Sequence, residues 1–425
     1  MTKDKTSISS FLSESGARFL RFISNIRNRM EIHKSLVVYY EPNKAVRQLL
    51  EDFRWMVNYA IEQGLKHGYS VKKLHELCYR FFADKFDYYT LYYPMAYRMA
   101  QSIIRTWRAN KGKNKPQMVK KIVRVHKMLF KLDVENSVLY LKVRKGETVQ
   151  LKLKLSDWHK EWLRRGHNGE ILINDKYVYI PITVQIDLTN PDKWVAVDVN
   201  ENNVTYVSSD GKAGKIVTGL KELKIAYANK RKNIQLKAKN SKRLKGLMQK
   251  YAERETNRTK DILHKLSRLL ADKFKGYGFL LEDLKGLRNS VNKRVRRFNK
   301  FSGKIQAVSI KNRFIKGRLN RMAFRKLQSY IEYKANLNAS PVRYLNPRNT
   351  SKFCFRCGGE INSLKCCPKC GLDRDVNACL NLLKMWGISV LPESLRYEVV
   401  KLPLTSGLSH DEEKAAELRE EVNLP

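Results

Sequence analysis

The stretch FCFRCGGEINSLKCCPKCGLDRDVNACLNLL, residues 353–383, joins two cysteine knuckles to the acidic start of a helix. Each knuckle is a Cys-x-x-Cys-Gly motif, and nine residues separate the two. Tetrahedral Zn²⁺ takes four thiolates, and each knuckle supplies two of them, with the glycine allowing the tight turn. Because the protein fills all four positions, the pattern indicates a structural rather than a catalytic zinc. The predicted ligands are Cys354, Cys357, Cys367 and Cys370.

The three other cysteines are interpreted differently. Cys366 lies beside Cys367 but does not fit the knuckle spacing. Cys78 and Cys379 lie on apolar helix faces, where we expect small core residues. The chain has seven cysteines, an odd number, and five of them fall within seventeen residues. This usage is typical of a metal site in a reducing compartment and not of a disulfide framework.

Three acids occur in apolar surroundings, in segments far apart in the sequence. Asp198 lies in KWVAVDVNEN, Glu282 in GFLLEDLKG and Asp375 in GLDRDVNACLNLL. The two-residue period of a strand puts Asp198 and Ala196 on the face opposite the flanking valines. A lone carboxylate is expensive to keep ionised in such a place. If the strands are neighbours and the last helix packs beside them, the acids can converge on Mg²⁺ or Mn²⁺. Two such ions about 3.5–4 Å apart can promote phosphodiester hydrolysis.

Each acid also has a purely structural interpretation. Asp198 precedes a polar turn, and either Glu282 or the following Asp283 could cap the next helix. Asp373 and Asp375 are both candidates for the N-cap of the last helix, where a carboxylate interacts favourably with the helix dipole. Spacing alone leaves the choice between Asp373 and Asp375 open.

The chain is very basic. Its 425 residues include 84 Lys and Arg against 41 Asp and Glu, which gives a formal net charge of +43. This excess is far beyond what solubility requires and indicates a polyanionic partner. No run of eighteen or more apolar residues occurs, so the sequence predicts neither a bilayer-spanning helix nor a membrane partner. Nucleic acid is therefore the expected partner.

Two basic segments, KRKNIQLKAKNSKRLK and NKRVRRFNK, are the candidates for contacts with nucleic-acid phosphates. Solvated helix faces are the alternative interpretation of both. The tyrosines between Tyr88 and Tyr97 could stack on bases, but packing in a helical bundle is preferred. The candidate phosphate-binding residues are Lys230, Arg231, Lys232, Lys242, Arg243, Arg294, Arg296 and Arg297.

The amino-terminal half is expected to contain a β domain with a helical insertion. Strand patterns at 36–45 and 116–190 predict a small β-barrel, and helical spacing at 46–115 predicts the insertion. Residues 1–35 are expected to form an amphipathic helical extension, or to be non-native sequence upstream of a start at Met30.

The carboxyl-terminal half is expected to form an α/β domain at 191–352 and 371–390, into which the cysteine segment 353–370 is inserted. A long, very basic helical stretch is predicted from Ala226 to Phe274. Residues 391–425, whose last part is acidic, are expected to form a mobile tail.

Together these motifs resemble those of TnpB proteins, transposon-encoded RNA-guided nucleases related to the type V CRISPR effectors. The matching stretches are VAVDVNENN, LLEDLKGL, the segment from FRKLQSYIEYKA to FCFRCG, and CPKCGLDRDVNACLNLL. The opening EPNKAVRQLLEDFRWMVNYAIEQGLK is also similar, and the resemblance covers residues 36–387. Alanine is usual in that family at the position of Cys379, a small-for-small difference.

The resemblance implies a multidomain α+β fold. Its parts are a β-barrel wedge domain with a helical recognition insertion, a RuvC-like nuclease domain of ribonuclease-H-like α/β fold, and an inserted zinc ribbon. It implies that Asp198, Glu282 and Asp375 are catalytic and bind magnesium or manganese, which selects Asp375 over Asp373. The implied partners are a guide RNA from the transposon end and a double-stranded DNA target. The expected state is a monomer or weak dimer in the cytoplasm, associated with the nucleoid of a prokaryote.

The expected function is that of an RNA-guided, Mg²⁺-dependent DNA endonuclease of a mobile element, acting after recognition of a short transposon-adjacent motif. The alternative is a nuclease-inactive RNA-guided DNA-binding protein that acts as a repressor, although all three acid positions are filled. A strand-joining DDE transposase is a third hypothesis, which the zinc ribbon just before the last acid disfavours.

Overall fold

The chain forms two compact units, Glu31–Gln185 and the part from Ile186 onward. The helical extension expected before Arg29 and the acidic end after residue 402 lie outside the described residues. None of the helices in the described part combines the length and apolar content that crossing a membrane requires. The computed structural model describes residues 29–402 except 113, 238–240, 311, 313–315, 318, 321, 362 and 363.

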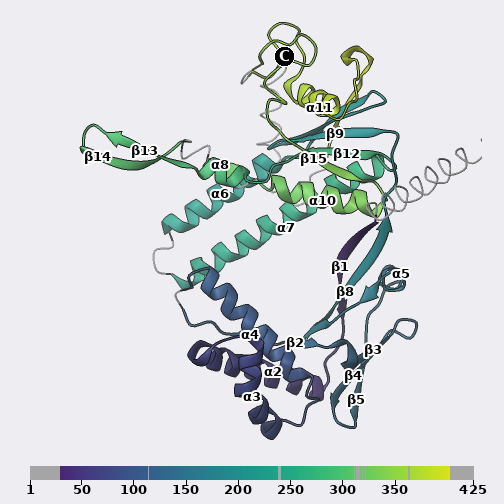
Figure 1. The fold of residues 1–425 in the computed structure, drawn as a ribbon, viewed down its shortest axis with the longest axis vertical. Coiled ribbons are helices and arrows are strands. Elements are labelled where there is room, and N and C mark those ends of the chain that lie inside the picture. Colours follow the sequence, from purple (N-terminus) through teal and green to yellow (C-terminus); the bar gives the residue numbers. More distant parts are fainter. Residues whose placement is uncertain are drawn as a thin grey trace, which may run out of the picture. The chain divides into compact units, whose positions relative to one another are not determined.

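The amino-terminal unit contains two small sheets rather than one continuous one (Figure 1). The first has the order β1-β8-β7-β2, with β6 paired to β8, and the second has the order β3-β4-β5. An isolated bridge joins Tyr40 to Leu153. The elements are β1 (Arg29–Tyr39), β2 (Ile122–Val125), η1 (Lys127–Leu129), β3 (Phe130–Asp133), β4 (Val138–Arg144), β5 (Glu147–Lys152), α5 (Asp157–Arg165), β6 (His167–Asn168), β7 (Ile171–Asn174) and β8 (Tyr177–Asp187).

Three helices lie between β1 and β2 in the sequence. α2 opens the helical insertion that the sequence predicts, and Asn43 caps it by accepting a hydrogen bond from the Val46 backbone N–H at 3.0 Å. The tyrosines of the following segment pack inside the bundle, which confirms the packing interpretation over base stacking. The helices are α2 (Lys44–His67), α3 (Val71–Lys85) and α4 (Tyr92–Ala109). The buried tyrosines are Tyr88, Tyr92, Tyr93 and Tyr97.

The carboxyl-terminal unit is built on a six-stranded mixed sheet with the order β15-β12-β9-β10-β11-β16. β9, β10 and β11 form an antiparallel meander. β12 pairs parallel to β9, and β15 pairs parallel to β12. The strands are β9 (Trp194–Val199), β10 (Asn203–Ser208), β11 (Lys212–Val217), β12 (Gly278–Glu282), β15 (Val342–Leu345) and β16 (Arg396–Lys401).

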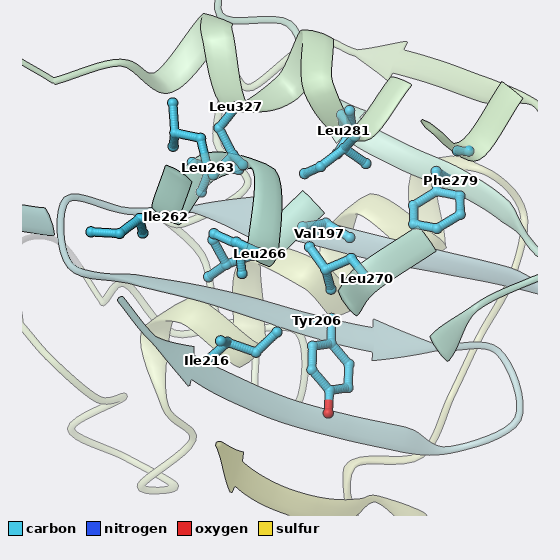
Figure 2. Packing of buried hydrophobic residues seen from close by; sticks show 14 of the residues in the cluster. Val197, Tyr206, Ile216, Ile262, Leu263, Leu266, Leu270, Phe279, Leu281 and Leu327 are labelled. Atoms are coloured by element: carbon cyan, nitrogen blue, oxygen red, sulfur yellow. The ribbon is translucent and has the colours of Figure 1, made fainter. Parts of the chain in front are cut away.

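Helices cover both faces of this sheet. On one face, Val197 and Leu281 of the central strands pack against Leu266 and Leu270 of α7, as Figure 2 shows, and against α6 and α10. On the other face, Ala196 and the central strands pack against α11. The helices are α6 (Leu220–Lys237), α7 (Lys242–Lys273), α8 (Leu287–Asn292), α10 (Phe324–Leu337) and α11 (Arg374–Met385).

The helical stretch predicted from Ala226 to Phe274 consists of two helices, because α6 ends at Lys237 and α7 begins at Lys242. Ser241 is the N-cap of α7, where its Oγ accepts from the Leu244 backbone N–H at 3.5 Å. The dense run of basic residues has good helix propensity on both sides of the break, so the pattern hides it.

Two expectations for the ends of the described range need correction. β1 begins at Arg29, so residues 29–35 are strand and not helical extension. Residues 396–401, expected in the mobile tail, form β16, which pairs parallel to β11 in the register Lys212↔Arg396. Both are strand pairings between distant segments, and local composition does not reveal such pairings. A further link holds β16, since Glu398 accepts hydrogen bonds from Tyr206 and Lys273.

Candidate active site and zinc ribbon

Asp198 lies near the end of the central strand β9 and faces α11. Val195, Val197 and Val199 belong to the core on the α7 side, whereas Ala196 belongs to the core on the α11 side. Asp198 shares the parity of Ala196 and is 8% exposed. Asn200 donates a hydrogen bond from Nδ2 to its Oδ2 at 2.8 Å. The alternation read from the sequence is therefore correct.

Glu282 ends the neighbouring strand β12 on the same face. The parallel register pairs Leu280 with Ala196 and Leu281 with Val197, so the next step along both strands brings Glu282 level with Asp198. Leu280 packs in the α11-side core, and Glu282 shares its parity. Thr350 donates from Oγ1 to Glu282 Oε1 at 2.7 Å, which orients the carboxylate.

Asp373 and Asp375 have different roles at the start of α11. Asp373 is the N-cap, and its Oδ1 accepts from the backbone N–H groups of Asp375 at 2.9 Å and Val376 at 3.1 Å. The Asp375 side chain is not used as a cap, and its Oδ2 lies 3.2 Å from Lys215 Nζ on β11. Capping therefore accounts for Asp373 and leaves the Asp375 carboxylate for another role.

Helix α11 carries Asp375 to the sheet because its apolar face packs on β9 and β10, beside which Figure 1 draws it. Cys379 is fully buried, and its Sγ donates to the backbone O of Thr205 at 3.4 Å. Thr205 is the residue of β10 opposite Asp198. The expectation that Cys379 is a small core residue is confirmed, and a small side chain is needed here because the helix lies directly above the strand that carries Asp198.

The acid triad, defined as Asp198, Glu282 and Asp375, interacts electrostatically. Burial, followed by the charges of Glu282 and Asp375, raises the pKa of Asp198 from 3.8 to about 8. The Asn200 hydrogen bond and the Arg374 charge act in the opposite direction. Burial also raises the pKa of Glu282, against the hydrogen bond from Thr350. Three segments distant in sequence thus hold carboxylates close enough to oppose one another's ionisation.

The donor chemistry of the triad fits a hard divalent cation. Its oxygen donors are the ligands that Mg²⁺ and Mn²⁺ prefer. Among the described residues, only the cysteine quartet gathers three or more metal-ligating side chains into a tight group, so the three acids are more widely spaced than the four sulfur atoms. Carboxylates that bind two metal ions about 3.5–4 Å apart need not contact one another. Lys215 pairs with Asp375 and with Asp373, and the charge of Arg374 acts on Asp198 and Glu282.

The four predicted zinc ligands converge. The Sγ atoms of Cys354, Cys357, Cys367 and Cys370 all lie within 4.8 Å of one another. Cys366 is exposed and stands outside this group, as its spacing predicts. In each knuckle the glycine after the second cysteine has a positive φ, 68° at Gly358 and 71° at Gly371, which a larger residue rarely adopts. The quartet is therefore compatible with a structural zinc.

An asparagine that the sequence analysis did not single out ties the zinc ribbon to α11. Asn377 is fully buried, and its Oδ1 accepts from the Phe355 backbone N–H at 2.6 Å. Its Nδ2 donates to the backbone oxygens of Thr350 at 3.2 Å and Phe353 at 2.9 Å. Because Thr350 also holds Glu282, the ribbon, α11 and two of the acids form one connected assembly. The asparagine of the DRDVNA motif, Asn377, is the sequence signal from which this role could have been predicted.

The predicted phosphate-binding residues fall into different environments. Arg231 and Lys224 both pair with Glu255, which is only 7% exposed, so Arg231 has an ion-pair partner within the protein, and its contact with phosphate stays a prediction. The Nζ of Lys230 lies 5.8 Å from the centre of the Tyr227 ring. Lys242 begins α7. The members seen to be exposed are Lys230, Lys232, Arg243, Arg294, Arg296 and Arg297.

The fold and the sites define a mixed α/β multidomain protein with a buried acid triad and a four-cysteine ribbon. The family model "Cas12f1-like, TNB domain" matches residues 324–382, which run from α10 into α11, and a model of the uncharacterized protein MJ0013 family matches residues 49–140. A chain of the cryo-EM structure of a Cas12f1–sgRNA–target DNA complex has a similar fold, with a TM-score of 0.50 and 13% identity over 83% of this chain and 98% of that one.

Two curated relatives are TnpB-like proteins of Methanocaldococcus jannaschii. MJ0751 is 34% identical over 277 residues, which are 60% of this chain and 93% of that protein. MJ1635 is 24% identical over 71% of this chain and 70% of that protein. The chain belongs to the TnpB-like family, which is related to the type V effectors.

Proposed function

We propose that the protein is an RNA-guided DNA endonuclease whose acid triad hydrolyses phosphodiester bonds. The observation that carries this proposal is the placement of the three acids: Asp198 and Glu282 lie level on the adjacent strands β9 and β12, on the face that α11 covers, and Asp375 lies in the first turn of α11. Burial and the charges of Glu282 and Asp375 raise the pKa of Asp198. Such an arrangement destabilises the folded protein unless a cation neutralises it. Side chains with strongly shifted pKa values are concentrated at functional sites.

The residues of the site have separable tasks under this proposal. Asp198, Glu282 and Asp375 would hold the ions. Bound there, two Mg²⁺ or Mn²⁺ ions would supply an activated water and stabilisation of the leaving oxygen. Thr350 keeps the Glu282 carboxylate oriented, at 2.7 Å. Asp373 fixes the first turn of α11, and thereby the position from which Asp375 reaches the site.

The zinc ribbon would stabilise the position of the triad rather than take part in chemistry. Four thiolates complete the coordination of Zn²⁺, so no position remains for water or substrate. Through Asn377 the ribbon is bonded to α11, and through Thr350 the segment leading to it is bonded to Glu282. The mixed sheet with acids on its central strands and on the covering helix supports the RuvC-like, ribonuclease-H-like interpretation of this unit.

Guide RNA and double-stranded DNA are the proposed partners. The net charge of +43 and the exposed basic residues of α7 and of the strand β13 (Arg294–Asn299) support a polyanionic partner. The similar Cas12f1 chain was solved with sgRNA and target DNA. The amino-terminal unit, with two sheets and three inserted helices, would provide the wedge and recognition domains. In guided systems base pairing reads the sequence, while the protein reads a short flanking motif and duplex shape.

The test is cleavage by the protein purified with its native RNA. Guide-matched DNA should be cut in Mg²⁺, mismatched DNA should not, and Asp198→Ala should lower the rate at least about a hundredfold, as expected for losing a group that acts on transition-state charge. Asp373→Asn, which keeps a good N-cap residue, is the matched control and should cut at nearly the wild-type rate. Guide-dependent binding without any nicking in Mg²⁺ or Mn²⁺ would instead establish the repressor hypothesis.

A further inference from the structure

A two-stranded hairpin follows the Glu282 strand and is not part of either core. The chain leaves β12, passes through α8, and forms β13 (Arg294–Asn299) and β14 (Lys304–Ser309), which Figure 1 draws as a ribbon continuing from α8. Among the described strands, β13 and β14 pair only with each other. A lone two-stranded hairpin is marginally stable in water, so this one is expected to gain stability from a partner.

The hairpin exposes large apolar side chains near its turn. Phe298 pairs with Ile305 across the two strands, and the two side chains are 63% and 69% exposed. Phe301, in the turn, is 103% exposed. Scattered single apolar residues need no explanation, but a contiguous group at the end of a ribbon is typical of a binding surface.

The same ribbon is strongly cationic. The register puts Arg294 and Arg296 on the face that carries Phe298, whereas Arg297 and Lys304 lie on the opposite face. The sequence has no Asp or Glu between Asp283 and Glu332. A partner for this surface must therefore combine closely spaced negative charges with flat apolar groups. An apolar protein surface lacks the charge, and an anionic lipid surface offers no specific flat group for a single phenyl ring.

Single-stranded nucleic acid combines both properties, because its bases expose their faces and its phosphates repeat along the chain. A continuous duplex hides those faces between stacked pairs. We propose that the β13–β14 hairpin binds single-stranded DNA, with a base stacked on Phe298 beside Ile305 and the flanking phosphates contacted by Arg294 and Arg296. The choice of DNA over RNA rests on the proposed function, since the hairpin follows the strand of Glu282 in the chain, after α8, and the strand to be cut is DNA.

The experiment uses the full-length protein with its RNA bound, in buffer without Mg²⁺ or Mn²⁺ so that cleavage does not interfere, and without a chelator so that the zinc ribbon stays intact. The probe is a fluorescein-labelled oligonucleotide of twenty thymidines, with a second version that carries one central 2-aminopurine. Phe298→Leu keeps an apolar side chain without a ring and should raise Kd for single-stranded DNA at least about fivefold. Phe298→Tyr keeps the ring and should bind within about twofold of wild type. Phe353→Leu, at a 39% exposed phenylalanine of the zinc ribbon, is the matched control and should also change Kd less than about twofold.

Two further readouts separate stacking from charge. Binding should quench 2-aminopurine fluorescence in the wild-type and Phe298→Tyr proteins and much less in Phe298→Leu. Arg296→Gln should lower the slope of log Kd against log salt by about 0.7, the value for one phosphate contact on a single strand. Equal weakening of a duplex by Phe298→Leu, or no weakening of the single strand, would overturn the proposal, and a larger effect on a uridine oligonucleotide would assign the surface to RNA. Because neither Mg²⁺ nor Mn²⁺ is present, failure to bind here is distinguishable from failure to cut in Mg²⁺.

Discussion

Replacing Asp198 by asparagine should stabilise the metal-free protein. The asparagine has nearly the shape of a protonated aspartate, and its amide oxygen can still accept the hydrogen bond that Asn200 donates at 2.8 Å. It carries no charge in the place where burial, Glu282 and Asp375 raise the pKa of Asp198 to about 8. The substitution therefore removes an unfavourable ionisation from the folded state without opening a cavity.

The size of the effect follows from proton linkage. Folding raises the pKa of Asp198 from 3.8 to about 8. The stability that the protonated Asp198 side chain contributes is therefore fully present below pH 3.8 and is lost as the pH rises towards 8. At about 1.4 kcal/mol per pKa unit, the penalty at pH 7 is on the order of 4 kcal/mol. For a unit of this size that corresponds to a rise in Tm on the order of 10 °C in the asparagine variant.

The assay is thermal unfolding at pH 4.5 and pH 8.5 in buffer without Mg²⁺ or Mn²⁺ and without a chelator, which would also remove zinc. The increase in Tm of Asp198→Asn over wild type should be small at pH 4.5 and large at pH 8.5. In excess Mg²⁺ it should shrink or reverse, because ions bind and stabilise only the wild-type triad. A variant that is no more stable than wild type at pH 8.5, or equally favoured at both pH values, would refute the reasoning.

Asp210→Asn is a control that should lower Tm at neutral pH, where Asp198→Asn should raise it. Burial by itself raises the pKa of Asp210. Hydrogen bonds from Ser208 and Tyr277 and the charge of Lys212 outweigh it and hold this pKa well below its usual range. The stability from this group is present above the unfolded pKa and is lost in acid. Asp210→Asn should therefore lower Tm at neutral pH, by an amount that diminishes as the pH falls.

Two further predictions concern the ribbon and the start of α11. Cys357→Ser should lose bound zinc, whereas Cys366→Ser should retain one zinc per chain, as measured by elemental analysis; equal retention by both would contradict the quartet. Asp373→Ala should destabilise the protein by about 1 kcal/mol through loss of the cap and keep much of its activity. Asp375→Asn should abolish cleavage at an unchanged or higher Tm. If Asp373→Ala abolished cleavage while Asp375→Asn lowered Tm and kept much of the activity, the roles assigned to the two residues would be exchanged.

Sequence reasoning succeeded where the physics is local. Strand alternation in VAVDV put Asp198 on the face opposite the valines, and the cores confirm that division. The bounds of β9 and β15 agree with their apolar runs. Knuckle spacing distinguished Cys366 from the four ligands. In each case the deciding information lies within a few residues of the feature.

The features that escaped prediction depend on contacts between distant segments. Thr350 donates to Glu282 across 68 positions, and Lys215 reaches Asp375 from another strand. Arg231 looked like a solvent-facing phosphate contact because its partner Glu255 lies on the next helix. The choice between Asp373 and Asp375 was undecided by spacing, since a cap is defined by backbone geometry at the helix start.

The most direct test of the central claim is to locate manganese in the protein by anomalous diffraction, with Mn²⁺ supplied in place of Mg²⁺. The account predicts ion density within coordination distance of carboxylate oxygens from Asp198, Glu282 and Asp375 together, and loss of that density in Asp198→Ala. Manganese bound elsewhere in a protein that cuts guide-matched DNA, with the triad left without ions, would contradict it.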